Sequence, residues 1–494
     1  MLLPDDVCER AGAMTAVQRS GQGSVESSGA TSGLALRAAL GIPLGALLAW
    51  ALVGAGFLNY DTAYSLLWGG DLAHGRAPDF TVPLAPTPHP LATLTGIVLT
   101  PFGDAAQPIW VVLAFGALGA LGWLSYELGA HWFGPAAGAV AALVILTRLP
   151  VLSFGVRAYV DIPYAALVLG AILAEARNPG SRRPLILLFL AGLLRPEAWL
   201  FSFAYVVWKR DFRLLPLAAA APVLWLVHDQ IVTGDWHHSL TDTRTNAETL
   251  RRITGLDDVP TTMPRRLGEI LREPALLGAA AGGILVLAFM RRRAGLLVAA
   301  GFLSIVAFCV LAAAGLPILT RYLIVPAAIL AVFCGAGVFG WLRMPPEHPW
   351  RKRWATIGGV VLAAFVIFAP SQLNRIGDLR DSMGIQSEIL SDLHSISEHI
   401  RCEPVGVPNH RPVPHVALWA DIAPGEIVSA QLEKIEAGVY LQPASERVLR
   451  NFTLDPNDPK RLTAAVPPGG FELELRNESW LLYSTCHIYD TATG

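Results

Sequence analysis

The chain carries little charge. Only 15% of its 494 residues are Asp, Glu, Lys or Arg, whereas 53% are hydrophobic, and the mean hydropathy is +0.47. Soluble domains contain more charge than this, so the composition indicates a polytopic membrane protein. The formal net charge of -2, with the arginines scattered in short clusters, argues against a nucleic-acid partner.

Cysteine is also scarce, and the five cysteines show no paired spacing of the kind that zinc sites need. Cys309 and Cys334 fall inside apolar segments, where packing explains them. Cys402 and Cys486 share a polar region. They can form a disulfide if that region is extracytoplasmic, and are otherwise two free thiols.

The sequence lacks a repeat period and a convincing inverted repeat, which weakens the hypothesis of a secondary transporter. Residues 1–33 contain no apolar run and are rich in Gly and Ser, so we expect a disordered cytoplasmic tail and not a cleavable signal. The first apolar segment, about 34–58, is too long for a signal-peptide core and is expected to stay in the bilayer.

What the chain does have is a series of apolar segments that can span a bilayer or nearly do so. They lie at about 34–58, 107–130, 135–153, 160–176, 213–233, 274–290, 294–315, 318–342 and 354–371. Residues 88–103 are short and bounded by prolines, which predicts a half-embedded or juxtamembrane helix. Residues 184–208 are interrupted at Arg195-Pro196-Glu197, which predicts two short helices in a hairpin.

These segments predict an all-α polytopic membrane protein with about 11 membrane-embedded segments. The basic clusters near 177–183, 209–213, 291–293 and 343–353 fall on one face if 184–208 is a hairpin, and that face is then cytoplasmic. Residues 59–87 become the first external loop and 234–273 a second long external loop. A single span at 184–208 would move every later element to the other side.

Residues 373–494 are more polar and predict a small extracytoplasmic domain of the α/β or α+β class, after a transmembrane domain over 34–372. Apolar residues recur with a helical period over 374–400. Short strand-like runs then follow at Val413–Trp419, Gly438–Gln442, Phe471–Leu475 and Trp480–Ser484.

Two carboxylates are predicted to lie at the same external membrane surface, where an acid is costly unless it has a function. Asp61 follows the first span, and on a helix starting there Tyr64 shares a stripe with it. That ring is a candidate substrate platform or an ordinary member of an interfacial aromatic belt. Asp161 precedes another span, where it either takes part in a site or caps the helix.

Two arginines are candidates for binding a phosphate at the same surface. Arg195 lies at the helix break with Glu197 two residues on, which indicates either a phosphate ligand held by a carboxylate or a structural ion pair. Arg321 and Tyr322 open a late span, and interfacial snorkelling is the competing interpretation of this pair.

Histidines and acids also gather at the end of the span 213–233. His228-Asp229 and Asp235-Trp236-His237-His238 are a candidate set of ligands for a divalent cation, although their spacing matches no strong metal motif. No other cofactor is indicated.

The order of these motifs resembles the GT-C superfamily of polytopic glycosyltransferases, close to the protein mannosyltransferase and aminoarabinose transferase group. The resemblance covers about 34–342 and rests on short motifs. They are Asp61 in the first external loop, His89-Pro90-Leu91, the Tyr159/Asp161/Pro163 segment, the Leu193–Glu197 break and Arg321-Tyr322.

The resemblance implies an enzyme that transfers a sugar from a polyprenyl-phosphate donor, with inversion, to an extracytoplasmic acceptor in a bacterial plasma membrane. Asp61 is then the catalytic base, Arg195 and Arg321 contact the donor phosphate, and Asp161 supports the site. Glu197, Tyr322, His89 and Tyr64 are further substrate-binding candidates. The acceptor stays open between a glycan, a lipid and a protein.

The chain departs from relatives of this group at two positions. Thr62 stands where several relatives carry a second acid, which leaves open whether Asp71 or Asp79 shares the role of base. Arg195 stands where some relatives have a lysine. The alternative function is a non-enzymatic transporter or lipid flippase, whose charged residues would lie at mid-span and not at helix ends. A structural envelope subunit would not need Asp61.

Overall fold

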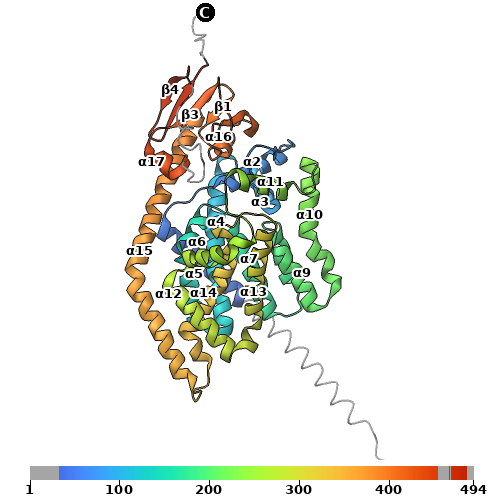
Figure 1. Ribbon diagram of the computed structural model, residues 1–494, viewed down its shortest axis with the longest axis vertical. Helices are drawn as coiled ribbons and strands as arrows, with labels where there is room; N and C mark the ends of the chain where they lie inside the picture. The colour runs from blue at the N-terminus through green and yellow to red at the C-terminus, as the bar shows by residue number, and fades with distance from the viewer. Residues whose placement is uncertain (1–32, 454–466, 468, 487–494) are drawn as a thin grey trace, which may run out of the picture.

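The computed structural model describes residues 33–453, 467 and 469–486, and these form a helical bundle with one small sheet at its C-terminal end (Figure 1). Residues 1–32 of the predicted cytoplasmic tail lie outside the described part. Residue 33 already begins the first helix, Gly33–Val53.

Within the described part of the chain, seven helical segments are long and apolar enough to cross a membrane. They are Gly33–Val53, Pro90–Phe133 (α3 Pro90–Leu99, η1 Thr100–Ala105, α4 Ala106–Phe133), Phe212–Thr233 (η2 Phe212–Leu214, α10 Leu215–Thr233), Leu256–Phe289 (η3 Leu256–Asp258, α12 Val259–Phe289), α13 Arg291–Ala313, Thr320–Arg343 (η4 Thr320–Leu323, α14 Ile324–Phe339, η5 Gly340–Arg343) and α15 Trp350–Ser397. The chain is therefore an integral membrane protein.

Two further expected spans are shorter or bent. α5 (Pro135–Leu146) and α6 (Leu149–Val156) meet at an angle of 65°, and counting them as one span gives eight. α7 (Asp161–Arg177) has 17 residues. The expected count of about 11 membrane segments is not confirmed by these lengths.

The hairpin predicted at 184–208 is confirmed. It consists of α8 (Arg183–Gly192) and α9 (Glu197–Lys209), separated by a break at Arg195. At its open end Lys209 pairs with Glu175 near the C-terminus of α7, and the Tyr205 hydroxyl donates to the same carboxylate over 2.7 Å. At its tip Arg195 reaches Asp161 at the N-terminus of α7. The hairpin therefore enters and leaves at one end of α7.

Helix α14 is at the centre of the bundle and packs against α4, α5, α12 and α15. Small residues allow these close approaches. A Cβ on Gly282 of α12, for example, would lie 1.9 Å from the carbonyl oxygen of Phe333 in α14. Only glycine fits there, and the tight seam gives a rigid support for the loops at either end of α14.

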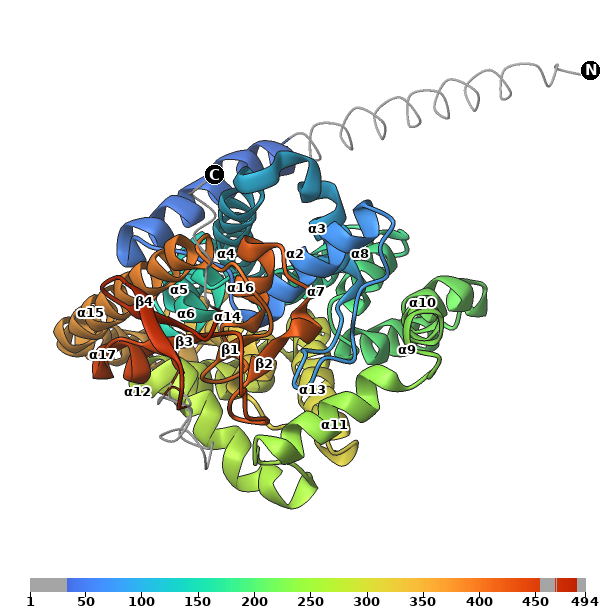
Figure 2. The same ribbon diagram turned by 90° about the horizontal axis from the view of Figure 1, so that it is seen from above.

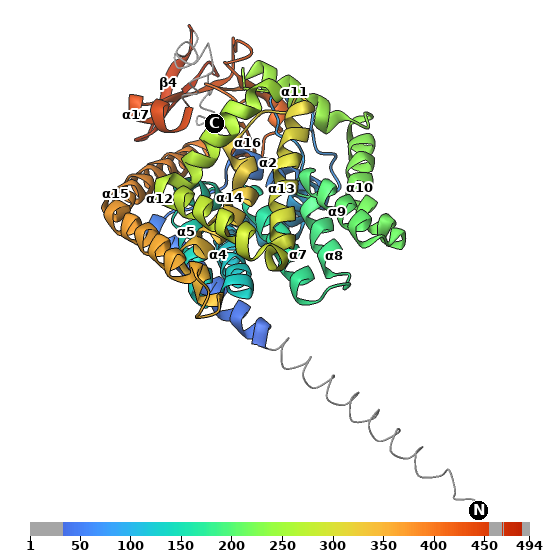
Figure 3. The same cartoon turned by 60° about the horizontal axis from the view of Figure 1, so that its bottom comes forward.

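Two short helices lie at the end of the bundle nearest the sheet domain, α2 (Tyr60–Ala73) and α11 (His238–Thr249) (Figures 1 and 3). α2 packs on α3, and a Cβ on Gly69 would lie 2.6 Å from the Cα of Gly96. The predicted juxtamembrane segment 88–103 is thus the separate helix α3 with the turn that follows it.

The C-terminal domain is carried on α15, which runs without interruption from the membrane region through the predicted boundary at 372/373. Its sheet has the order β2-β1-β3-β5-β4, with β1 parallel to β2 and β3, and β5 antiparallel to β3 and β4. The strands are β1 Val405–Val407, β2 Ile427–Ser429, β3 Val439–Pro443, β4 Glu472–Arg476 and β5 Trp480–Ser484, joined by α16 Val413–Ala420, η6 Pro424–Glu426, α17 Glu446–Val448 and η7 Leu449–Thr453.

The end of α15 belongs to the core of this domain. Ile389, Leu393 and Ile396 are buried against the sheet, and the indole of Trp480 donates to the carbonyl of Ile389 over 3.0 Å. Seen from above, the domain lies over the helical bundle (Figure 2). α16 packs against α2, which fixes the domain above the segment predicted to be the first external loop.

The strand predicted at Val413–Trp419 is wrong, because this segment forms helix α16. Five consecutive residues, 413–417, are buried, and a short apolar run buried on all sides has no periodicity that distinguishes a helix from a strand. The strands predicted near 438–442, 471–475 and 480–484 are confirmed as β3, β4 and β5.

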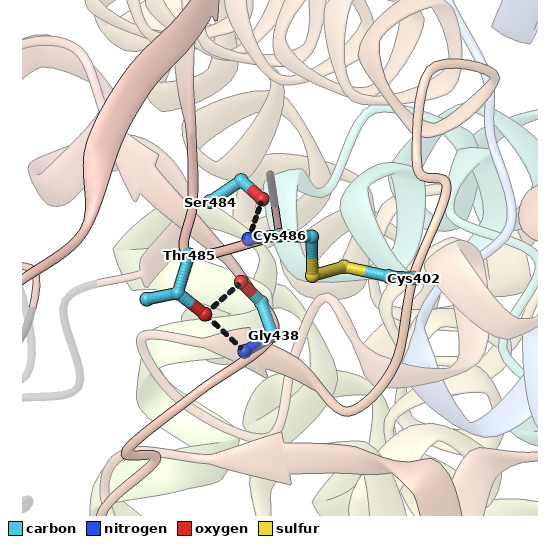
Figure 4. The surroundings of a disulfide bond; sticks show 5 residues. All are labelled: Cys402, Gly438, Ser484, Thr485 and Cys486. Carbon is cyan, nitrogen blue, oxygen red and sulfur yellow. Dashed lines mark hydrogen bonds between the residues drawn. A yellow bond between two sulfur atoms is a disulfide. The ribbon is translucent and has the colours of Figure 1, made fainter. Parts of the chain in front are cut away.

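Cys402 and Cys486 form a disulfide, with their Cα atoms 6.8 Å apart (Figure 4). Cys402 follows α15 and Cys486 follows β5. Beside them Thr485 accepts a hydrogen bond from the Gly438 amide over 2.9 Å. The disulfide therefore links the segment after α15, where the sheet domain begins, to the segment after β5.

Candidate active site

A cavity of about 870 Å³ lies between the end of the helical bundle and the C-terminal domain. Asp61, Arg195, Glu197 and Arg321 all line it, although they come from three separate regions of the sequence. Of the four side chains expected to converge, Asp61, Arg195 and Arg321 line the cavity. The fourth, Asp161, contacts both arginines but does not line the cavity itself.

Asp61 is fixed by the first turn of α2. The side chain of Asn59 caps this helix and accepts hydrogen bonds from the amides of Asp61 at 2.7 Å and Thr62 at 3.3 Å. Asn59 also donates to the carbonyl of Arg157, and the Thr62 hydroxyl donates to the carbonyl of Ala158, each over 2.7 Å. These contacts hold the first turn of α2 against the loop before α7.

Acidic and basic side chains alternate through the site. Arg321 donates from Nη1 to Asp61 Oδ2 over 2.8 Å, and its Nε lies 3.8 Å from Asp161 Oδ2. Arg195 donates from Nη1 to Asp161 Oδ1 over 2.5 Å and from Nε and Nη2 to Glu197 Oε1 over 2.9 and 2.7 Å. The order Glu197–Arg195–Asp161–Arg321–Asp61 gives every cation two anionic neighbours.

The two aspartates differ in accessibility, and this decides their roles. The Asp61 side chain is 16% exposed, whereas that of Asp161 is 1% exposed and does not line the cavity. Asp161 lies behind the two arginines and orients both of them, while Asp61 faces the space that a ligand can enter.

Aromatic rings support the guanidinium groups. The Cζ of Arg195 lies 3.9 Å from the ring centroid of Tyr322, and the Cζ of Arg321 lies 5.0 Å from that of Tyr159. Both distances allow cation–π attraction, which is stronger away from water. Tyr322 therefore holds an arginine in place as well as lining the cavity.

Arg321 decides the protonation state of Asp61. Burial raises the pKa of a carboxyl, but the adjacent Arg321 guanidinium, together with the weaker effects of His89 and Arg252, lowers the pKa of Asp61 below its ordinary value. His89 lies nearby, and burial lowers its pKa to about 4, so its imidazole is neutral at pH 7. Its Nδ1 has no hydrogen-bond partner among the described residues.

The cavity has an excess of positive charge and an apolar wall. Six arginines line it against three carboxylates, a balance that favours an anionic ligand. The arginines are Arg157, Arg195, Arg252, Arg266, Arg321 and Arg411, and the carboxylates are Asp61, Glu197 and Asp229. Leu200 and Phe203 of α9, Leu226 of α10 and Val310 of α13 form an apolar part of the cavity wall.

Three predicted residues are placed elsewhere. Tyr64 is fully buried between the rings of Tyr60 and Trp68 and does not line the cavity, so the prediction that it is a substrate platform is not supported by its position. Asp71 pairs with Arg76, and Asp79 accepts hydrogen bonds from Thr81; neither acid lines the cavity. Of these three acids of residues 59–87, Asp61 is thus the one that reaches the cavity.

The candidate cation ligands near α10 do not come together. Within the described residues there is no group of three or more His, Cys, Asp or Glu side chains that could hold a metal ion. Asp229 instead accepts hydrogen bonds from the amide and hydroxyl of Ser239 over 2.9 and 2.8 Å, which ties α10 to α11.

Several lining residues were not predicted from the sequence. His410, Arg411, His415, Asn451 and Phe452 come from the C-terminal domain. Their only sequence signal is the position of His410 and Arg411 directly after a short apolar run, and that run was not recognised as the strand β1.

Comparison with known proteins supports the fold. No protein-family model matches the sequence, and no curated protein matches it. Among solved structures, ArnT from Cupriavidus metallidurans bound to undecaprenyl phosphate matches with a TM-score of 0.52 and 11% identity, over 93% of this chain and 99% of that chain.

The chain has the fold of this ArnT structure. The predicted resemblance to the aminoarabinose transferase group is thus confirmed for the fold. ArnT in the apo state is a second match, with a TM-score of 0.47 and 13% identity over 93% of this chain and 98% of that chain.

Proposed function

We propose that the chain is an integral membrane glycosyltransferase that transfers a sugar from a polyprenyl-phosphate donor to a hydroxyl group on the extracytoplasmic side. The observation that carries this proposal is an accessible carboxylate, Asp61, held 2.8 Å from Arg321 at the mouth of an arginine-rich cavity with an apolar wall. The ArnT structure with undecaprenyl phosphate shows a ligand of this class on the same fold.

Asp61 serves as the general base in this mechanism. Its carboxylate takes the proton of the acceptor hydroxyl, and the acceptor oxygen attacks the anomeric carbon. The bond from that carbon to the phosphate oxygen breaks, and polyprenyl phosphate leaves with the electron pair. A single displacement of this kind inverts the anomeric configuration.

Arg321 and Arg195 stabilise the leaving phosphate. A guanidinium has five N–H donors, so both arginines can hold their carboxylate partners and still donate to phosphate oxygens. The apolar wall formed by α9, α10 and α13 suits the polyprenyl chain, because it continues from the charged site toward the membrane. The distribution of the basic clusters supports an extracytoplasmic position for this end of the bundle.

The test is sugar transfer by the purified full-length protein in liposomes. Donors are polyprenyl-phosphate mannose, polyprenyl-phosphate arabinose and the pool of labelled lipid-linked sugars extracted from source cells grown on radiolabelled glucose. Membranes of a deletion strain supply the acceptors. We expect Asp61→Asn to reduce the rate by about 100-fold or more, and Asp71→Asn to transfer like the wild type. Equal rates for Asp61→Asn and wild type would rule out Asp61 as base.

A transporter or flippase gives a different result in the same liposomes. It moves a labelled lipid-linked sugar between leaflets without breaking the bond to phosphate. If no donor supports transfer and translocation is retained, the transporter or flippase function replaces the enzymatic proposal.

A further inference from the structure

The sheet of the C-terminal domain has a topological switch point. β1 lies between two parallel neighbours, and the chain returns to β2 on one side of it and to β3 on the other. In open sheets with parallel strands, ligands bind in the crevice beyond the carboxyl ends of the strands at such a point. β1 ends at Val407, so the crevice begins with the residues that follow.

These residues face the cavity that contains Asp61. His410 and Arg411 lie three and four residues after the end of β1 and line the cavity, as does Asn451 of η7. The ring of His410 meets that of Tyr60 edge to face, with centroids 5.1 Å apart, and Tyr60 is the neighbour of Asp61. The crevice of the domain and the candidate base therefore belong to one space.

The crevice is built of fixed side chains. Asn409 accepts a hydrogen bond from the amide of Arg411 over 3.1 Å, and Nδ1 of His410 lies 2.9 Å from Oε1 of Gln431. Arg411 donates from Nη1 to the carbonyl of Phe452 over 2.8 Å. Polar groups placed this way need little reorganisation when a ligand binds.

His415 gives an independent indication of a ligand. It lies in α16, its side chain is buried with 3% of its surface exposed, and it lines the cavity. Its Nδ1 has no hydrogen-bond partner within the described residues. Burial lowers its pKa to about 3, so the ring is neutral and presents one donor and one acceptor. A buried polar group left unpaired is costly, and a ligand hydroxyl would satisfy it.

We infer that the crevice at the carboxyl end of β1, with His415 and Asn451, is the acceptor subsite and binds the polyhydroxylated head of a glycan or glycolipid. The inference rests on the proposed function, because it assigns the second substrate of the same reaction. Imidazole, guanidinium and amide groups hydrogen-bond to hydroxyls, and the rings of Tyr60 and Phe452 add flat apolar faces.

The two substrates then approach Asp61 from opposite sides. The polyprenyl donor enters along the apolar wall of α9, α10 and α13, and the acceptor head binds under the C-terminal domain. Asp61 lies between them, where a base must lie to take the proton of the acceptor hydroxyl.

The experiment compares His415→Phe, which keeps a ring against Trp419, with His415→Asn, which restores a polar group near Nδ1. His399→Phe, an exposed histidine of the same domain outside the cavity, is the control. Full-length proteins in liposomes receive the labelled donor pool and increasing amounts of deletion-strain membranes. Binding of undecaprenyl phosphate is measured separately.

We expect His415→Phe to raise the apparent KM for acceptor about tenfold, as loss of one buried hydrogen bond does, with kcat and undecaprenyl phosphate binding near wild type. His415→Asn should recover part of the loss. An unchanged KM, or weaker undecaprenyl phosphate binding, overturns the subsite. Label in the protein fraction instead of the glycan and lipid fractions overturns the acceptor class. No transfer by the wild type overturns the proposed function, and this inference with it.

Discussion

Asp61 and Arg321 form an ion pair that affects the ionisation of the proposed base. Because Arg321 lowers the pKa of Asp61, the carboxylate is ionised at neutral pH and loses its charge only as the pH falls through that lowered pKa. We therefore expect that protonation of Asp61 causes no fall in kcat/KM for transfer between pH 8 and about pH 5. Arg321→Gln removes the strongest of the neighbouring charges that lower this pKa while burial still raises it, so the acidic limb should move up by about 1 to 3 pH units.

The measurement is kcat/KM between pH 4 and 8 for both proteins. The quantity compared is the pH at which kcat/KM falls on the acidic side. This pH does not depend on the lower overall rate that Arg321→Gln also causes. Arg76→Gln removes the partner of Asp71 outside the cavity and is the matched control. A limb at the same pH in Arg321→Gln and wild type would show that Arg321 does not set the ionisation of the base.

Loss of Asp161, which contacts both arginines of the proposed site, should reduce stability. It is buried between Arg195 and Arg321, and removing one partner from a buried ion pair leaves an uncompensated charge. We expect Asp161→Asn to destabilise the folded protein by about 3–5 kcal/mol, seen as a lower unfolding temperature in detergent. Asp71→Asn, at the partly exposed Asp71–Arg76 pair, should change it by less than about 0.5 kcal/mol. Equal stability of the two variants would contradict this role.

The sequence predicted which charged residues meet, and the family resemblance suggested their roles, but neither showed which of the two aspartates is covered by packing. Asp61, Asp161, Arg195 and Arg321 are recognisable because each ionisable group stands at the end of an apolar segment, where its cost demands a reason. Which of the two aspartates is covered depends on tertiary packing of the hairpin against α7. A single sequence contains no signal for that.

At the scale of elements, the hairpin of α8 and α9 sets the membrane topology. Its open end meets Glu175 and its tip meets Asp161, so the hairpin enters and leaves at the same end of α7. The basic residues near 177–183 and 209–213 predict that this end lies in the cytoplasm. We expect cysteines introduced as Arg182→Cys and Asp211→Cys, both at exposed positions, to react with an impermeant maleimide only in inside-out vesicles. Thr241→Cys, exposed on α11, should react only in right-side-out vesicles.

The labelling needs a background in which Cys8 and Cys309 are replaced by Ala. Labelling of Arg182→Cys and Asp211→Cys from opposite sides would mean that 184–208 crosses the membrane once. The cavity would then open on a different side from the one proposed.

Element type was predictable where a pattern was long or had a clear break. The interruption at Arg195-Pro196-Glu197 predicted a hairpin correctly, since proline disrupts a helix locally whatever the tertiary context. α16 was wrongly predicted as a strand, because in a segment buried on every side the hydrophobic pattern carries no period. β1 and β2 have three residues each, too few for any pattern to identify.

At the scale of the whole molecule, the cavity exists because residues about 350 positions apart in sequence meet. Tyr60 contacts His410, and α16 packs on α2, so the C-terminal domain closes the space above the base. Contacts at this separation leave no local trace in the sequence. The domain could be predicted from composition, but its position over Asp61 could not.

The Cys402–Cys486 disulfide should hold this closure in place. It closes a loop with a sequence separation of 84, and a disulfide restricts the unfolded chain, which contributes about 2–4 kcal/mol. In the double variant Cys402→Ser/Cys486→Ser we expect faster amide hydrogen exchange in β1 and β3 but unchanged exchange in α14, because the bundle is packed independently of the bond. Cys309→Ser, which changes a free cysteine of α13, is the control.

The same double variant distinguishes an effect on the position of the C-terminal domain from an effect on the residues proposed to carry out the reaction. If the domain forms the acceptor side of the cavity, loosening it should raise the apparent KM for acceptor more than it lowers kcat, because Asp61 and Arg321 both belong to the bundle side. Unchanged exchange in β1 and β3, together with an unchanged KM, would show that the packing of α16 on α2 and of α15 on the sheet is sufficient to keep the domain in place.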